Sequence, residues 1–100
     1  MKADRHTLQL CSQIAESLHL IFLDQNDDDL RDLTVVEVLP LAGASTLLVR
    51  VQYPVTKPGD LARVQEKITS HLKMLRAEVA SCITRRRVPE LFFQVSASTG

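Results

Sequence analysis

The sequence predicts an α+β domain built from a three-stranded β-sheet that carries helices on one of its faces. Two long stretches, 5–23 and 61–83, repeat apolar residues at the three- and four-residue spacing of a helix with one buried side. Three shorter segments, 33–40, 46–53 and 91–95, are rich in the β-branched and aromatic residues that pack well on a pleated sheet. The resulting order is α-β-β-α(α)-β, and a layer of helices over one face of a sheet buries every apolar stripe.

The first helix is expected over residues 5–23. Asp4 is a suitable N-cap, because its carboxylate can accept hydrogen bonds from the first free N–H groups. The helix should end at Leu23, because the next segment, 24–29, consists of turn-forming and acidic residues, which are unfavourable at a helix C-terminus. The stripe that we expect to be buried consists of Leu8, Cys11, Ile14, Ala15, Leu18, Ile21 and Phe22.

Residues 33–40 and 46–53 are predicted to form an antiparallel hairpin, because only a short connection containing glycine separates them. Pro40 either ends the first strand or lies at a sheet edge. The second strand alternates along its length, which assigns each residue to one face of the sheet. One face should carry Leu47, Val49, Val51 and Tyr53, and the other Leu48, Arg50 and Gln52.

A long helix is expected from residue 61 up to the basic run at 85–87. Such a length is unusual in so small a domain, so we expect a bend or a short break. Cations are favourable at a helix C-terminus, and Pro89 prevents the helix from continuing. The last strand is expected over 91–95, followed by a frayed tail at 96–100.

Length and composition indicate one domain that spans residues 1–100. No segment approaches the length of about 20 apolar residues that a membrane span needs. The first residues also lack the apolar run of a secretory signal, so we expect a cytoplasmic protein. The two cysteines, Cys11 and Cys82, fall at apolar positions of helical patterns and are predicted to be buried free thiols.

The residues predict neither catalysis nor metal or cofactor binding. Only three glycines are present, so there is no glycine-rich phosphate loop, and the serines lie in helical patterns rather than at a nucleophile elbow. The acidic cluster at 24–32 lacks the turn glycine of a calcium loop, and we expect it to be a solvated loop. His6, His19 and His71 are far apart and have no motif partners. We therefore expect a protein that is not an enzyme and has no small-molecule substrate.

The charge distribution predicts a local basic surface. The formal net charge is zero, but residues 1–50 carry −4 (four basic and eight acidic residues) and residues 51–100 carry +4 (eight basic and four acidic). A neutral total argues against indiscriminate coating of nucleic acid, whereas a polarised chain permits one basic face. Arginine suits phosphate because its planar guanidinium donates hydrogen bonds in pairs. The predicted RNA-binding residues are Lys67, Lys73, Arg76, Arg85, Arg86 and Arg87.

The segment 76–93 resembles the C-terminal signature of the ribosome-binding factor A family. The resemblance is carried by Arg76 in the long helix, the basic run at 85–87, Pro-Glu-Leu at 89–91 and Phe-Phe at 92–93. It implies a type II KH-like fold, whose α-β-β-α-α-β order agrees with the order read from the residues. It also implies binding to the small ribosomal subunit and its rRNA during late maturation.

The sequence departs from this family at the junction between two helices. Family members have an Ala-x-Gly kink there, and spacing places the kink here at 71–73, where His-Leu-Lys has neither the alanine nor the glycine. The resemblance therefore implies a divergent member of the family.

Two function classes follow from these observations. The first is a ribosome-assembly factor, and the second is a protein–protein interaction module that kept the fold and lost RNA binding. The zero net charge, the missing kink residues and the acidic segment 27–29 favour the second, which could pair through an exposed strand edge. The helix cations would then form a solvated face with salt bridges to Glu66 and Glu78. In both cases we expect a monomer.

Overall fold

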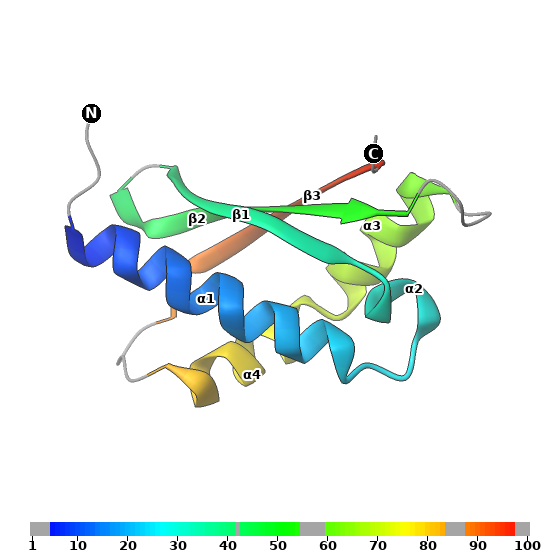
Figure 1. The fold of residues 1–100 in the computed structure, drawn as a ribbon, viewed down its shortest axis with the longest axis horizontal. Coiled ribbons are helices and arrows are strands. Elements are labelled where there is room, and N and C mark those ends of the chain that lie inside the picture. The colour runs from blue at the N-terminus through cyan, green and yellow to red at the C-terminus, as the bar shows by residue number, and fades with distance from the viewer. Residues whose placement is uncertain (1–4, 42, 55–59, 84–87, 98–100) are drawn as a thin grey trace.

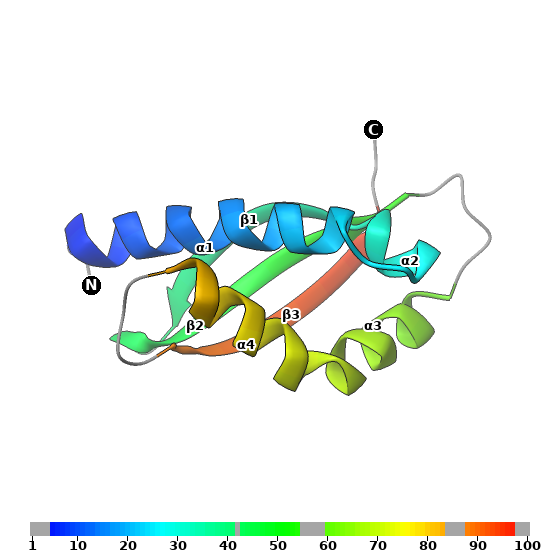
Figure 2. The same cartoon turned by 90° about the horizontal axis from the view of Figure 1, so that it is seen from below.

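The computed structural model of the chain describes residues 5–41, 43–54, 60–83 and 88–97. A three-stranded mixed sheet forms one layer, and the helices cover one of its faces, as Figure 1 and Figure 2 show from two sides. The predicted fold class is confirmed, including the placement of the helices. In chain order the elements are α1 (Arg5–Leu23), α2 (Asp28–Arg31), β1 (Thr34–Leu41), β2 (Gly43–Tyr53), α3 (Leu61–Ser70), α4 (Leu72–Cys82) and β3 (Glu90–Ala97).

The sheet has the strand order β1-β2-β3, with β2 in the centre. β1 and β2 are antiparallel neighbours, so the predicted hairpin is confirmed. β3 runs parallel to β2, which places α3 and α4 in the crossover that two parallel strands require. Pro40 lies inside β1, where it is tolerated because β1 is an edge strand whose outer side has no partner strand.

The hydrophobic core lies between the helices and the inner face of the sheet. The strict alternation of β2 assigned the inward-facing residues correctly, because all four are buried and the residues between them are not. Helix α1 covers the sheet, and α4 packs beside α1. The buried residues of α1 are Thr7, Leu10, Cys11, Ile14, Leu18, Ile21 and Phe22.

Helix α1 has the predicted bounds, but its first turn faces the core differently from the prediction. Leu8 is 53% exposed, whereas Thr7 and Leu10 are buried. At 100° per residue, Leu8 lies about 100° away from the centre of the buried arc of α1, outside the surface that the sheet covers. The expectation that Leu8 is buried is therefore wrong.

The long helix is broken at His71, within the segment where spacing placed the kink. His71 has φ −99° and ψ 5°, outside the helical range. Its backbone N–H and its ring Nδ1 both contact the carbonyl oxygen of Lys67, at 3.0 and 2.8 Å. The last turn of α3 is closed in this way without alanine or glycine at the break. The predicted interruption is confirmed.

A short helix, α2, replaces the solvated acidic loop that the sequence predicted between α1 and β1. Asp27 is its N-cap, because Oδ1 accepts hydrogen bonds from the N–H groups of Asp29 and Leu30 at 2.9 and 3.3 Å. Leu30 and Leu33 are buried in the core, and Asp29 is only 7% exposed. The prediction of a solvated loop is wrong here, because the cap and the two leucines fold this segment onto the core.

Two further expectations need correction. Cys82 is exposed at the end of α4, whereas Cys11 is buried as predicted. Strand β3 includes Ser96 and Ala97, which the sequence assigned to the frayed tail. The strand extends this far because Tyr53, the last residue of β2, pairs with Ala97. Residues 98–100 lie outside the described residues. None of the helices in the described ranges is both long and apolar enough to cross a bilayer.

Candidate nucleic-acid interface

Three of the six predicted RNA-binding residues lie on α3 and α4, and their side chains have different surroundings. Lys67 on α3 contacts the acidic segment next to α2, and Arg76 on α4 reaches the chain that enters β3. Lys73 is exposed in the first turn of α4. The other three residues, Arg85 to Arg87, lie outside the described residues. The described cations therefore do not form one continuous patch.

Lys67 is held between two aspartates. Its Nζ lies 2.7 Å from Oδ2 of Asp29 and 3.0 Å from Oδ2 of Asp27. The hydrogen bond to Asp29, and next the one to Asp27, raise the pKa of Lys67 above its usual value. The two carboxylates neutralise the positive charge of Lys67, and its side chain is only 32% exposed. Lys67 therefore adds little positive potential to the surface.

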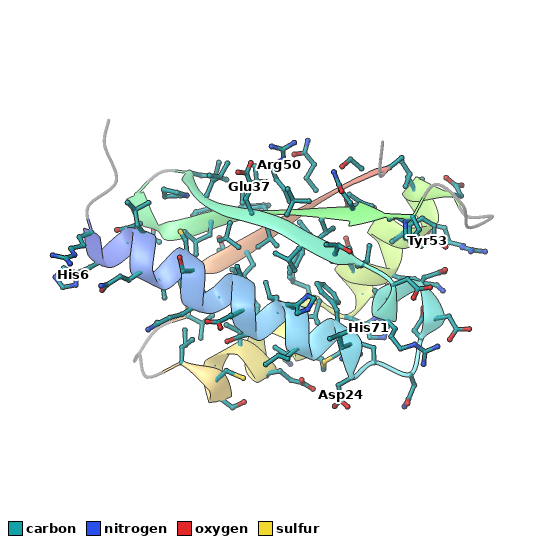
Figure 3. The ribbon with its side chains drawn as sticks, viewed as in Figure 1. His6, Asp24, Glu37, Arg50, Tyr53 and His71 are labelled. Carbon is teal, nitrogen blue, oxygen red and sulfur yellow. The ribbon has the colours of Figure 1, made fainter. Side chains whose placement is uncertain are left out.

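Asp29 is the centre of this ionic network. Its Oδ1 accepts a hydrogen bond from Tyr53 Oη at 2.6 Å, and its Oδ2 lies 3.3 Å from Nη2 of Arg63. The hydrogen bond from Lys67, followed by the one from Tyr53, lowers the pKa of Asp29 to about 2, although burial acts in the opposite direction. Figure 3 shows Tyr53 at the end of β2, beside α2 and α3. One carboxylate thus connects α2, β2 and α3.

This network was missed at the level of the sequence, because an acidic cluster without glycine is typical of a solvated loop. The available signal is the pair Leu30 and Leu33, since two leucines at helical spacing within an acidic segment indicate a buried turn. A carboxylate next to them then needs hydrogen-bond donors, which Tyr53 and Lys67 supply. In the part of the chain that the structure describes, no three His, Cys, Asp or Glu side chains gather to hold a metal ion.

Arg76 connects α4 to the chain that enters β3. Its Nη2 donates a hydrogen bond to the carbonyl oxygen of Val88 at 3.1 Å. Its Nε is buried and has no hydrogen-bond partner among the residues that the structure describes. The hydrogen bond to Val88 holds the chain that enters β3 against α4. Because Arg76 is half-buried, its guanidinium presents only part of its surface to solvent.

Lys73 is exposed and makes no ion pair within the described ranges. The N-terminus of α4 next to it has no side-chain cap. Backbone N–H groups at a helix N-terminus favour anions, and the charge of Lys73 acts in the same direction. Glu66 and Glu78, the salt-bridge partners that the alternative explanation requires, pair with none of the three described cations.

The face of the sheet opposite the helices is open. Cross-strand pairing places Leu39, Leu48 and Phe92 in one row, and Phe92 is 54% exposed. In the adjacent row, Nη1 of Arg50 lies 2.6 Å from Oε1 of Glu37. Figure 3 shows this pair on the side of the sheet away from the helices. The open face therefore combines an apolar row with a neutral ion pair.

Gln65 on α3 occupies the outer edge of β3. Its Nε2 donates to the carbonyl oxygen of Phe93 at 2.9 Å, and its Oε1 accepts from the N–H of Val95 at 3.2 Å. The carboxamide makes the pair of bonds that a neighbouring strand would make. An added strand would therefore have to displace Gln65 before it could pair with β3.

Comparison with known proteins identifies the fold of this chain. No protein-family model and no curated protein matches the sequence. Among solved structures, the Era protein of Aquifex aeolicus aligns with a TM-score of 0.40 and 14% identity, over 96% of this chain and 33% of that chain. Ribosome-binding factor A of Thermus thermophilus aligns with a TM-score of 0.73 and 24% identity, over 87% of this chain and 92% of that chain. The chain therefore has the KH-like fold of ribosome-binding factor A.

Proposed function

We propose that this protein is a divergent relative of ribosome-binding factor A that binds the small ribosomal subunit and its rRNA during maturation, without catalysing a reaction. The observation that carries the proposal is the fold shared with that factor over 87% of this chain. The break between α3 and α4 supports it, because KH domains clamp the nucleic-acid backbone at this junction. We further propose that the chain acts as a cytoplasmic, monomeric, single-domain protein.

The six predicted RNA-binding residues take unequal parts in this proposal. Lys73 and the run Arg85 to Arg87 make the main phosphate contacts, because Lys73 is exposed and has no ion pair among the described residues, and the run places three arginines shortly after α4 in the sequence. Arg76 contributes through the part of its guanidinium that Val88 does not engage. Lys67 contributes least, because Asp27 and Asp29 match its charge.

Sedimentation with small ribosomal subunits at low salt tests the proposal. Replacing Arg85, Arg86 and Arg87 together with alanine should weaken binding and reduce the salt dependence. Each lost phosphate contact lowers the slope of log affinity against log salt by about 0.7–0.9. Lys73→Ala should cause a smaller loss of the same kind.

A matched triple variant separates a local site from a general charge effect. Arg5 on α1, Arg31 on α2 and Arg50 on β2 are three exposed arginines outside α3 and α4. Their joint replacement with alanine should leave sedimentation near the wild-type level. Equal losses in both triple variants would indicate non-specific attraction, and binding that survives the loss of Arg85 to Arg87 would contradict the proposed role of the run.

The second candidate function, a protein–protein interaction module, is favoured by one observation, the apolar row of Leu39, Leu48 and Phe92 on the open face. A nucleic-acid ligand would gain little from the neutral pair Glu37–Arg50 beside that row. A pull-down that is insensitive to nuclease, returns a protein partner or a second copy of the chain, and is lost in Phe92→Ser would support this second function over the first.

A further inference from the structure

A shallow groove runs between α1 and α4 on the helical side of the molecule. Figure 2 shows the C-terminal part of α4 lying beside α1. Two adjoining hollows, with volumes of about 410 and 430 Å³, share Ser17, Leu20 and Cys82 in their walls. Together they follow α1 from Gln13 to Asp24, which corresponds to about 17 Å of helix. The groove is therefore long enough for about three turns of a second helix.

The floor of this groove is apolar and accessible. Leu20 is 64% exposed, Leu23 is also exposed, and the thiol-bearing Cys82 faces them from α4. A single exposed leucine needs no explanation, but exposed apolar side chains that meet in a hollow are typical of a binding surface.

The walls of the groove carry carboxylates without partner cations. Glu16 comes from α1, Asp24 directly follows that helix, and Glu78 comes from α4. Among the described residues, none of the three takes part in an ion pair, and no lysine or arginine lines either hollow. The groove is therefore apolar at its floor and negative at its walls.

We propose that the α1–α4 groove binds a basic amphipathic helical segment of a partner protein. The apolar stripe of such a segment would cover Leu20, Leu23 and Cys82, and its lysines or arginines would lie against Glu16, Asp24 and Glu78. A nucleic acid is excluded as the ligand, because phosphates would face three unpaired carboxylates. The inference does not depend on the proposed function, because Lys67, Lys73 and Arg76, the described residues assigned to RNA, line neither hollow.

Helix α1 supplies a matched control for the groove. Leu8 is an exposed leucine on the same helix, and its neighbours in a separate hollow are Arg5, Gln9, Ser12 and Gln13, with no carboxylate among them. Leu8 thus has the exposure of Leu20 without the negative surroundings. Leu20→Lys and Leu8→Lys make the same change in charge and size at two exposed positions of one helix.

The probe is a synthetic amphipathic peptide of leucine and lysine, about 14 residues long, with one apolar stripe at helical spacing. A second peptide carries glutamate in place of every lysine. We expect the lysine peptide to bind the full-length protein, as measured by fluorescence anisotropy, and the glutamate peptide not to bind. Leu20→Lys should weaken binding at least about tenfold, because it removes apolar contact and repels the peptide, whereas Leu8→Lys should not.

The carboxylates are tested by a second matched pair of variants. Replacing Glu16 and Glu78 with glutamine should weaken binding about threefold to tenfold and reduce its salt dependence. Glu66 and Glu90 are exposed and line neither hollow, so their replacement with glutamine should change little. Circular dichroism of every variant verifies that the fold is retained.

The reactivity of the Cys82 thiol reports peptide binding without an added label. Cys82 is the exposed thiol of the chain, while Cys11 is buried. The bound lysine peptide should slow modification of Cys82 by a thiol-specific reagent and leave the slow reaction of Cys11 unchanged. Unprotected Cys82, equal binding by the Leu20→Lys and Leu8→Lys proteins, or equal protection by a single-stranded RNA would each overturn the proposal. None of these outcomes bears on sedimentation with small subunits, so the two proposals fail separately.

Discussion

The carboxylate of Asp29 shows how one side chain can change the role of several others. Its two oxygens accept contacts from Tyr53, Lys67 and Arg63, which come from β2 and α3. Without Asp29, the buried hydroxyl of Tyr53 would lose the carboxylate that accepts its hydrogen bond. Lys67 would retain its ion pair with Asp27. The positive charge of Lys67 therefore serves the fold before it can serve a ligand.

Asp29→Asn keeps the size of the side chain and removes its charge. We expect it to lower the free energy of unfolding by about 1–3 kcal/mol, because hydrogen bonds to a charged group are replaced by weaker ones. Urea titration measures this difference. The control is Asp28→Asn, whose side chain is 73% exposed, and which should change stability by less than about 0.5 kcal/mol. Equal effects of the two substitutions would contradict the role assigned to Asp29.

The lowered pKa of Asp29 also predicts a pH dependence of stability. Lys67, and next Tyr53, lower this pKa from the usual 3.8 to about 2 in the folded chain. The ionised carboxylate therefore stabilises the fold fully above about pH 4, and this contribution is lost as the pH falls towards 2. Urea midpoints measured between pH 6 and pH 2 should decline less steeply in Asp29→Asn than in the wild-type protein. Parallel declines would show that other groups dominate acid unfolding.

Lys67 and Lys73 show why residue roles are harder to predict than elements. Both are lysines on the same helical pattern, six positions apart. The sequence therefore contains no reason to treat them differently. The structure separates them because α2 folds back onto α3 and brings two aspartates to Lys67. Such a contact joins segments about 40 residues apart, and the periodicity of one helix contains no information about it.

Among the elements, the α3–α4 break is the one that helix length predicted and that the family resemblance located, without identifying its chemistry. Spacing indicated residues 71–73, and His71 is the residue at which the helix stops. The ring of His71 adds a contact to the carbonyl oxygen of Lys67 that an aliphatic side chain could not make. A histidine can thus stabilise a junction that another sequence forms with alanine and glycine.

His71→Ala should therefore lower the free energy of unfolding by about 1 kcal/mol, the usual net value of one hydrogen bond. Thr69→Ala is the control, because its hydroxyl also bonds a carbonyl oxygen four residues earlier, but on an exposed helix surface. There the loss is offset by the higher helix propensity of alanine, and we expect a change within about 0.5 kcal/mol. Chemical denaturation distinguishes the two, and a larger effect of Thr69→Ala would contradict this account of the break.

The other elements were predictable where periodicity is long and regular. Helix α1 has the expected bounds, and β2 buries the expected residues, because both patterns extend over many positions. Helix α2 was missed because four residues are too few to show a period. Leu8 and Cys82 were assigned to the core wrongly, because each lies at the margin of an apolar stripe where the sequence does not show how far the neighbouring element extends.

For the whole molecule, helices on one face of the sheet create surfaces of different character. Among the described residues, the α1–α4 groove is acidic and apolar, and the open sheet face is apolar beside a neutral ion pair. The difference in charge between the two halves of the sequence only permitted a local basic face. The charge pattern could not place the groove, because α1 and α4 are distant in the chain and meet only through the tertiary fold.

The carboxamide of Gln65 affects how readily the protein aggregates at high concentration. Strands at the rim of a sheet recruit copies of themselves, and this is how many folded proteins begin to form fibrils. Here the rim at β3 is already filled by a side chain from α3, through Phe93 and Val95. Recruitment at this rim therefore requires α3 to detach first. At the β3 rim, the period of greatest risk is therefore the interval during synthesis or refolding before α3 docks.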